Sequence, residues 1–198
     1  MKARKLQDIC TDIFAGAAIF SNDSLSRDYK NGGYRVIRLA DIQNNEISFR
    51  DCLFYNTHDY KKNRYLLQDN DILLSSRGTI FKVAIFHKGN SYKTIPSGFL
   101  TCIRLNPDLN MSVNYVAAYL RHKENSIITN NRNSKKINDR KTKIQLKLSD
   151  IYDIKIPMIS AEVQKNIDKL SSKATEYLNK SIQNNKKIED LIEYGNLN

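Results

Sequence analysis

The side chains best suited to metal-dependent hydrolysis in this sequence are Asp108, Asp153 and Lys155. Two carboxylates and a lysine can support nuclease chemistry when they converge on Mg²⁺ at the end of a strand. Here the two acids are far apart, Asp108 follows Pro107 in a turn-like pair, and Asp153 lies in a predicted strand. A small nuclease therefore stays open as an alternative that the spacing does not favour.

No other set of side chains has the spacing of a catalyst or a metal site. No two cysteines form a C-x-x-C pair, no two histidines have metal-ligand spacing, and neither a glycine-rich phosphate loop nor a G-x-S-x-G elbow occurs. The adjacent glycines Gly32 and Gly33 indicate a turn. We therefore expect no catalytic residue, no metal and no bound cofactor in this chain. The isolated residues are His58, His87, His122, Cys10, Cys52 and Cys102.

Lysine and arginine side chains instead gather in predicted loops and around a predicted hairpin. Arginine is suited to bidentate contact with a guanine edge, and both residue types bind phosphates with an affinity that falls as salt rises. A single surface charge is more often only solvated, so the clustering is what indicates a DNA-binding surface. The candidate DNA-contacting residues are Lys61, Lys62, Arg64, Arg77, Lys82, Arg132, Lys135, Lys136, Arg140, Lys141 and Lys143.

The whole chain carries an excess of positive charge. It contains 32 Lys and Arg against 21 Asp and Glu, which gives a net charge of +11. Such an excess predicts a polyanionic partner, with nucleic acid first and an acidic membrane surface second. The apolar run from Ile13 to Phe20 is too short to span a bilayer, and the widely spaced cysteines fit a reducing compartment. We therefore expect a soluble, cytoplasmic protein.

Residues 1–157 have the pattern of a compact domain with short strands and one clear helix. Gly78, between two apolar runs, is expected at positive φ in a hairpin. Ser112 is a predicted helix N-cap, and the apolar face after it contains Val113, Val116, Ala117 and Leu120. The predicted strands are residues 34–40, 46–49, 71–76, 82–86, 99–105 and 151–156. The mixture predicts an α+β fold with β-hairpins.

Residues 158–198 predict one long helix that begins after the N-cap Ser160 and runs to Tyr194 without Pro or Gly. Its apolar residues follow the 4-3-4-3 spacing of a coiled-coil seam. At 1.5 Å per residue the helix would extend roughly 50 Å, so it needs a partner helix to cover this seam. The alternative is a helix that folds back on its own domain. The predicted dimerisation residues are Val163, Ile167, Leu170, Ala174, Tyr177, Ile188 and Leu191, while Ser181 and Asn184 occupy seam positions that fix register.

Four segments in chain order carry a family resemblance. They are Leu6–Ile9 with Gly16, then 33–42, 71–80, and 154–157 followed by Glu162 and Gln164. Together they resemble the target recognition domain, and its exit into a long helix, of the specificity subunits of Type I restriction–modification systems. The likeness covers nearly the whole chain.

The sequence departs from the family pattern at four places. Asn70 stands where a Gly usually precedes Asp71, and Asn tolerates the left-handed conformation that such a turn needs. Phe81 replaces the second Gly of the hairpin segment. Met158 lies where the second Pro is usual, and Val163 separates Glu162 from Gln164.

The resemblance implies a function in DNA recognition without catalysis. A full subunit of the family has two recognition domains, separated by two long helices in an antiparallel coiled coil, and this chain resembles one domain and one helix. We therefore expect a two-fold homodimer that recognises an interrupted palindrome in double-stranded DNA. An S-adenosylmethionine-dependent adenine methyltransferase subunit is the expected partner, with a restriction subunit as a further one, and S-adenosylmethionine is expected in the methyltransferase.

Two alternatives to this interpretation remain besides the nuclease. One is a recognition domain associated with a fused restriction–methylation enzyme. The other is a basic coiled-coil adaptor protein without sequence-specific DNA binding. Charge reversal of Arg77 and of the basic cluster from Arg132 to Lys143 separates the two classes, because it should abolish DNA binding but leave the dimer of an adaptor intact.

Overall fold

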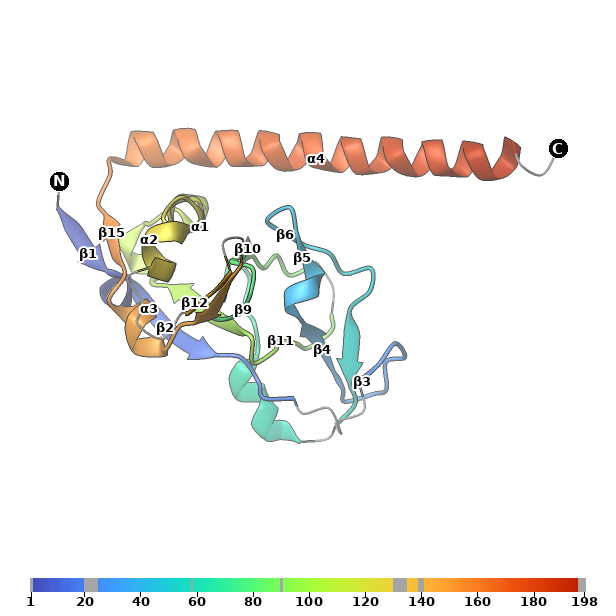
Figure 1. Ribbon diagram of the computed structural model, residues 1–198, viewed down its shortest axis with the longest axis horizontal. Coiled ribbons are helices and arrows are strands. Elements are labelled where there is room, and N and C mark those ends of the chain that lie inside the picture. Colours follow the sequence, from blue (N-terminus) through green and yellow to red (C-terminus); the bar gives the residue numbers. More distant parts are fainter. Residues whose placement is uncertain are drawn as a thin grey trace. The chain divides into compact units, whose positions relative to one another are not determined.

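A computed structural model of the protein describes residues 2–19, 25–57, 59–89, 91–129, 135–138 and 141–195. The chain divides into two units, Met1–Met158 and Ile159–Asn198. We call the first unit the body; the second unit consists mainly of the long helix α4 (Figure 1). Short strands, several short helices and one long C-terminal helix confirm the predicted α+β class.

A four-stranded antiparallel sheet with the order β10-β8-β12-β2 forms the centre of the body. Ile72, Leu73 and Leu74 of β8 are fully buried, which is the pattern of a strand covered on both faces. The predicted hairpin is confirmed, because β8 pairs with β10 and Gly78 between them has φ +127°. The strands are β2 (Cys10–Ala15), β8 (Ile72–Ser75), β10 (Val83–Ile85) and β12 (Leu100–Leu105).

A second four-stranded sheet has the order β11-β4-β7-β3, with a parallel pairing between β11 and β4. Tyr34, Val36 and Ile95 form its core with Ala17. Ala17 bridges to Ser97, so the residue before it must approach the backbone closely: a Cβ on Gly16 would lie 2.2 Å from the carbonyl oxygen of Ser97. The strands are β3 (Leu25–Ser26), β4 (Tyr34–Ile37), β7 (Leu53–Tyr55) and β11 (Thr94–Pro96).

The predicted strand 34–40 ends early, at Ile37. The Asp41 carboxylate accepts the backbone N–H of Arg38 (2.7 Å) and pairs with its guanidinium (2.7 Å), which turns the chain into the 3₁₀ helix η2 (Leu39–Asp41). The predicted strand 46–49 is shorter than expected. Its first residues form β6 (Glu46–Ile47), which pairs with β5 (Ile42–Gln43).

The tight turn between β5 and β6 explains this local pairing. Asn44 and Asn45 have φ of 50° and 65°. A two-residue turn with positive φ at both positions matches the twist of a hairpin, and Asn is among the residues that adopt it most readily.

Helix α1 (Val113–His122) is confirmed with its predicted N-cap, because the Ser112 hydroxyl accepts the N–H of Tyr115 (3.0 Å). Its buried face contains Val116, Ala117 and Leu120 as predicted, and also Tyr115. The remaining short helices of the body are η1 (Leu6–Ile9), η3 (Tyr60–Tyr65), η4 (Pro107–Leu109), α2 (Glu124–Thr129) and α3 (Leu148–Tyr152).

The prediction of a strand over 151–156 is wrong in its first half. The Asp150 carboxylate accepts the N–H of Lys147 (2.7 Å), and this cap starts helix α3, which buries Ile151. A strand begins only at β15 (Lys155–Pro157), which pairs with β1 (Ala3–Lys5). Capping and burial therefore override the β-propensity of the segment.

The three cysteines carry free thiols. Burial raises the pKa of the Cys10 and Cys52 thiols to about 12, and it raises that of Cys102 as well. These thiols are therefore protonated at neutral pH and pack as small apolar side chains.

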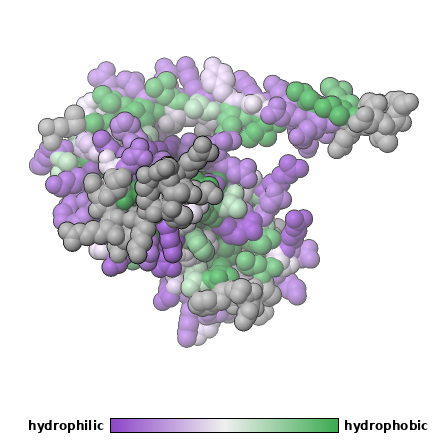
Figure 2. Space-filling model, in the orientation of Figure 1, coloured by the Kyte–Doolittle hydropathy of each residue, from purple (hydrophilic) through white to green (hydrophobic). Residues whose placement is uncertain are grey.

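Helix α4 (Ala161–Gly195) is 35 residues long, as the uninterrupted pattern predicts. The Ser160 hydroxyl accepts the N–H of Val163 (3.4 Å), and its carbonyl accepts that of Gln164 (3.1 Å). The surface of α4 alternates between hydrophobic and hydrophilic residues along its length (Figure 2). In the described residues, no helix is both long and apolar enough to cross a membrane.

An ion pair between Asp71 and Arg104 joins the two central strands of the first sheet. Asp71 is 1% exposed. Its two carboxylate oxygens accept hydrogen bonds from Nε (2.8 Å) and Nη2 (2.7 Å) of Arg104. One oxygen also accepts the N–H of Gln68 (2.7 Å), which closes the turn before β8. Asn70 in this turn has φ 68°, so the predicted left-handed Asn is confirmed.

We predict that Asp71→Ala lowers the free energy of unfolding by about 3 kcal/mol, because it leaves the Arg104 guanidinium without its buried partner. Urea unfolding measures this change. The matched control is Asp69→Ala, whose exposed carboxylate accepts only one backbone N–H, from Lys88 (2.8 Å), and which should cost about 1 kcal/mol or less. Equal losses for the two variants would contradict the role given to the ion pair.

Candidate nucleic-acid interface

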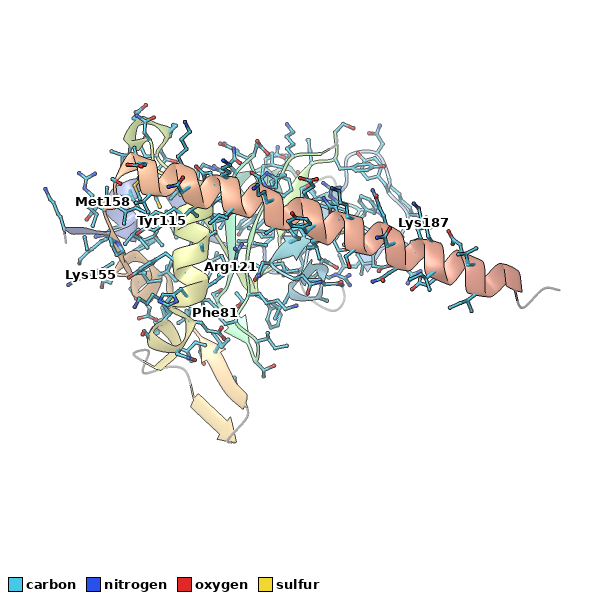
Figure 3. All side chains as sticks on the ribbon, turned by 90° about the horizontal axis from the view of Figure 1, so that it is seen from above. Phe81, Tyr115, Arg121, Lys155, Met158 and Lys187 are labelled. Carbon is cyan, nitrogen blue, oxygen red and sulfur yellow. The ribbon has the colours of Figure 1, made fainter. Side chains whose placement is uncertain are left out.

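A three-stranded sheet with the order β13-β14-β9 carries the largest group of predicted DNA-contacting residues. Its strands are β9 (Arg77–Gly78), β13 (Lys135–Asn138) and β14 (Lys141–Gln145). We call this sheet the basic ribbon. Figure 3 shows its β13–β14 part extending from the body on the side where Phe81 is labelled.

The place of Arg77 between two apolar runs suggested a simple hairpin tip. The structure shows a different position. Arg77 forms β9 and pairs with Gln145 of β14. Leu146 N–H donates to the Ser76 carbonyl (2.8 Å), which holds the start of β9 against the end of β14. Arg77 is exposed.

The register of the basic ribbon makes basic residues of β13 and β14 ladder neighbours. Lys135 is the ladder partner of Lys143, and Lys136 is the partner of Thr142. Ile144 is buried while Lys143 and Gln145 are exposed, so β14 has one inward and one outward face.

Several predicted residues are only partly described. The side chains of Lys135, Lys136 and Lys141 lie outside the described side chains, although their backbones form the ribbon. Arg132 and Arg140 lie outside the described residues. Their role stays a prediction.

A second basic group lies on η3, apart from the ribbon in the fold. Tyr34 of β4 donates its hydroxyl to the Asn63 side chain (2.8 Å), which anchors η3 to the second sheet. Lys61 and Arg64 are exposed, and Arg64 stacks its guanidinium over the ring of Tyr65 at 4.6 Å. A neighbouring ring stabilises such a guanidinium in an extended position that a phosphate or a base can reach.

Lys62 in η3 is more constrained than its two basic neighbours. Its ammonium lies 5.5 Å from the ring centre of Tyr55 and donates to the carbonyl of Ala18 (3.4 Å). The side chain is half-buried, and these contacts help to hold η3 in place.

Lys82 has a structural position instead of the expected free surface position. Its ammonium donates to the carbonyl oxygens of Leu39 (3.1 Å) and Ile42. These contacts tie the β8–β10 hairpin to η2 and β5. We therefore leave Lys82 out of the proposed DNA-binding surface.

Sequence patterns missed two exposed apolar residues and one exposed amide beside Arg77. Ile80 and Phe99 are exposed, and Gln145 is the ladder partner of Arg77. Ile80 lies between the predicted strands 71–76 and 82–86, in a segment noted only for the family resemblance. The prediction placed Phe99 at the start of the strand 99–105, whereas the observed strand begins at Leu100.

The residues of the nuclease alternative are not brought together. Asp153 forms an ion pair with Lys5 (2.6 Å), which raises the pKa of that lysine. Asp153 and Lys155 line a cleft between α1–α2 and α3–β15, but Asp108 in η4 is not among the lining residues. Among the described residues, no group of three His, Cys, Asp or Glu side chains could hold a metal ion. The geometry thus gives the nuclease alternative no support.

The comparisons with known proteins agree with this fold. The family model described as the Type I restriction modification DNA specificity domain matches residues 1–194. The chain belongs to this family, whose members are non-catalytic in general. A comparison with curated proteins gave no match.

Solved structures confirm the fold at low sequence identity. The HsdS subunit from Thermoanaerobacter tengcongensis superposes with a TM-score of 0.55 at 14% identity, over 89% of this chain and 37% of that chain. The S subunit of a type I restriction–modification system from M. genitalium gives 0.58 at 15%, over 96% and 43%. A structure described for complex assembly and conformational transition of the type I R-M system gives 0.60 at 14%, over 96% and 43%. The chain spans about two fifths of the length of these relatives.

We predict that Arg77→Gln and Lys143→Gln each weaken binding to double-stranded DNA. Each should also lower the slope of log affinity against log salt, by about one for the phosphate-neutralising Lys143, because each removes one positive charge that faces the DNA. Fluorescence anisotropy over a range of salt concentrations measures both quantities.

The matched control is Lys88→Gln. Lys88 is exposed but follows β10 at the end of the β8–β10 hairpin that is far from Arg77. A salt slope that stays at the wild-type value in both ribbon variants, or that falls equally in the control, would argue against the basic ribbon as the DNA-binding surface.

Proposed function

We propose that the chain is a DNA specificity subunit of a Type I restriction–modification system, and that its body recognises one half of a bipartite site. Support comes from family membership together with the basic ribbon, which presents Arg77 and Lys143 on an exposed face. The major groove admits a β-ribbon, and an arginine there can contact guanine with two hydrogen bonds.

The observation that carries the second half of the proposal is the exposed apolar seam of α4. Val163, Leu170, Tyr177, Ile188 and Leu191 are between 46% and 72% exposed. A regular series of such side chains along one helix is typical of a coiled coil whose partner helix is needed to cover it. We infer an antiparallel homodimer, in which two bodies are held at a separation set by α4.

A two-fold dimer of this kind presents the same DNA-reading surface twice. The target would then be an interrupted palindrome, and α4 would determine the gap between its halves. The helix pair would also be the docking surface for an adenine methyltransferase subunit, which would bind S-adenosylmethionine and modify the target, with a restriction subunit as a further partner. The chain itself supplies binding and no catalytic group.

We predict that the protein sediments as a dimer at micromolar concentration and that Leu170→Glu makes it a monomer. Leu170 occupies a seam position and is 66% exposed, so a charge there would be buried in the dimer. Analytical ultracentrifugation distinguishes the two states. The control is Ser172→Glu, which lies on the opposite side of the helix by heptad position and should leave the dimer intact; a monomeric wild type would refute the dimer.

We predict that co-expression with a methyltransferase subunit of the same system produces methylated adenines in a two-part motif with palindromic halves. Genome-wide mapping of modified adenines measures the motif, the gap and the symmetry together. Two unrelated halves made by this chain alone would exclude the homodimer. Methylation that does not depend on this chain would exclude the specificity function.

A further inference from the structure

Two large apolar side chains lie exposed beside Arg77. Ile80 is 57% exposed and Phe99 is 55% exposed. Single exposed apolar residues are common on protein surfaces and need no function. This pair is informative because both residues are attached to the same short backbone segment, Ser75–Arg77, from which the basic ribbon starts.

Hydrogen bonds hold both residues to that segment. The hydroxyl of Ser75, which is fully buried, donates to the carbonyl of Ile80 (3.1 Å). The backbone N–H groups of Ser76 and Arg77 point to the carbonyl of Phe99 at 3.0 and 3.3 Å. The positions of Ile80 and Phe99 relative to Arg77 are therefore set by the buried strand β8.

The segments that carry the two residues are themselves fixed on either side. The Ser75 hydroxyl also accepts the N–H of Lys82 (2.8 Å), which closes the chain after Ile80. Leu100, next to Phe99, pairs with Ser75 in the β8–β12 ladder. A side chain on a backbone held in this way can make a contact of defined geometry with a ligand, since little ordering of the backbone is required on binding.

The positive charge around Ile80 and Phe99 indicates which kind of partner binds there. Exposed Arg77 and Lys143 lie on the same ribbon, and the described neighbours of Ile80 along the chain are Thr79 and Phe81, which add no negative charge. A basic surface that contains apolar side chains fits the floor of the DNA major groove better than an acidic or purely apolar protein surface. In that groove, the 5-methyl group of thymine is the apolar feature that identifies a base.

We infer that Ile80 and Phe99 are specificity-determining residues that contact thymine methyl groups beside the base contacted by Arg77. The inference rests on the proposed function in DNA recognition. Ile80 and Phe99 read the presence of the methyl group, while Arg77 and the lysines of the ribbon hold the surface in the groove.

The test starts with selection of preferred sequences from a random pool of double-stranded DNA by the full chain. Each thymine of the selected sequence is then replaced singly by uracil, which removes only the methyl group. At one or more thymines, the wild type should bind the uracil duplex about fourfold more weakly, the effect expected for one lost buried methyl contact. Ile80→Ser or Phe99→Ser should bind the thymine and uracil duplexes equally at that position.

Leu25→Ser is the matched control, because Leu25 is an exposed apolar residue on β3 in the other sheet and should keep the wild-type ratio. Thermal unfolding confirms that each variant is folded. A selected sequence at which the wild type does not distinguish thymine from uracil, or wild-type ratios in both serine variants, overturns the inference. A serine variant that binds the thymine duplex and the uracil duplex more weakly than the wild type by the same factor also overturns the inference. That result indicates that the side chain inserts between bases and does not contact the methyl group. A pool in which no sequence is enriched contradicts the proposed function instead.

Discussion

The body depends on one buried carboxylate. Asp71 accepts two hydrogen bonds from Arg104 and one from the turn before β8, so it fixes β8 against β12 and at the same time sets where β8 begins. The part of the candidate surface around Arg77 continues from β8: Ser75 holds Ile80, and Arg77 follows as β9. The buried Asp71 carboxylate thus fixes the arrangement of the strands. This agrees with the view that buried ion pairs contribute more to a unique arrangement than to net stability.

Several residues of the motifs that indicated the family have structural explanations that require no DNA contact. Leu6 and Ile9 are fully buried, Gly16 leaves room for the Ser97 carbonyl, and Gly78 adopts positive φ. Such positions can be recognised in sequence because each is set by local sterics or burial. For the same reason they say little about which bases are bound, since base contacts come from exposed side chains on the ribbon.

The errors of prediction have two physical origins, which are local caps that compete with a β-rich run and contacts between distant residues. Local patterns identified α1, α4 and the β8–β10 hairpin, whose signals are periodicity, capping and turn residues. They did not identify α3, whose cap at Asp150 competes with a β-rich run, or the pairing of Arg77 with Gln145 across distant parts of the chain. They also did not reveal that the Lys82 ammonium donates to the carbonyl oxygens of residues 39 and 42.

The heptad seam of α4 has a consequence for how such a protein can change its target. A helix advances about 1.5 Å per residue, so one added or removed heptad preserves the seam and changes the length by about 10 Å. Neighbouring bases in one strand are about 3.4 Å apart, so that change corresponds to about three base pairs. Under the proposed function, the number of base pairs between the two half-sites therefore changes in discrete steps of about three. Substitutions in the body alter the half-site sequence without altering this number.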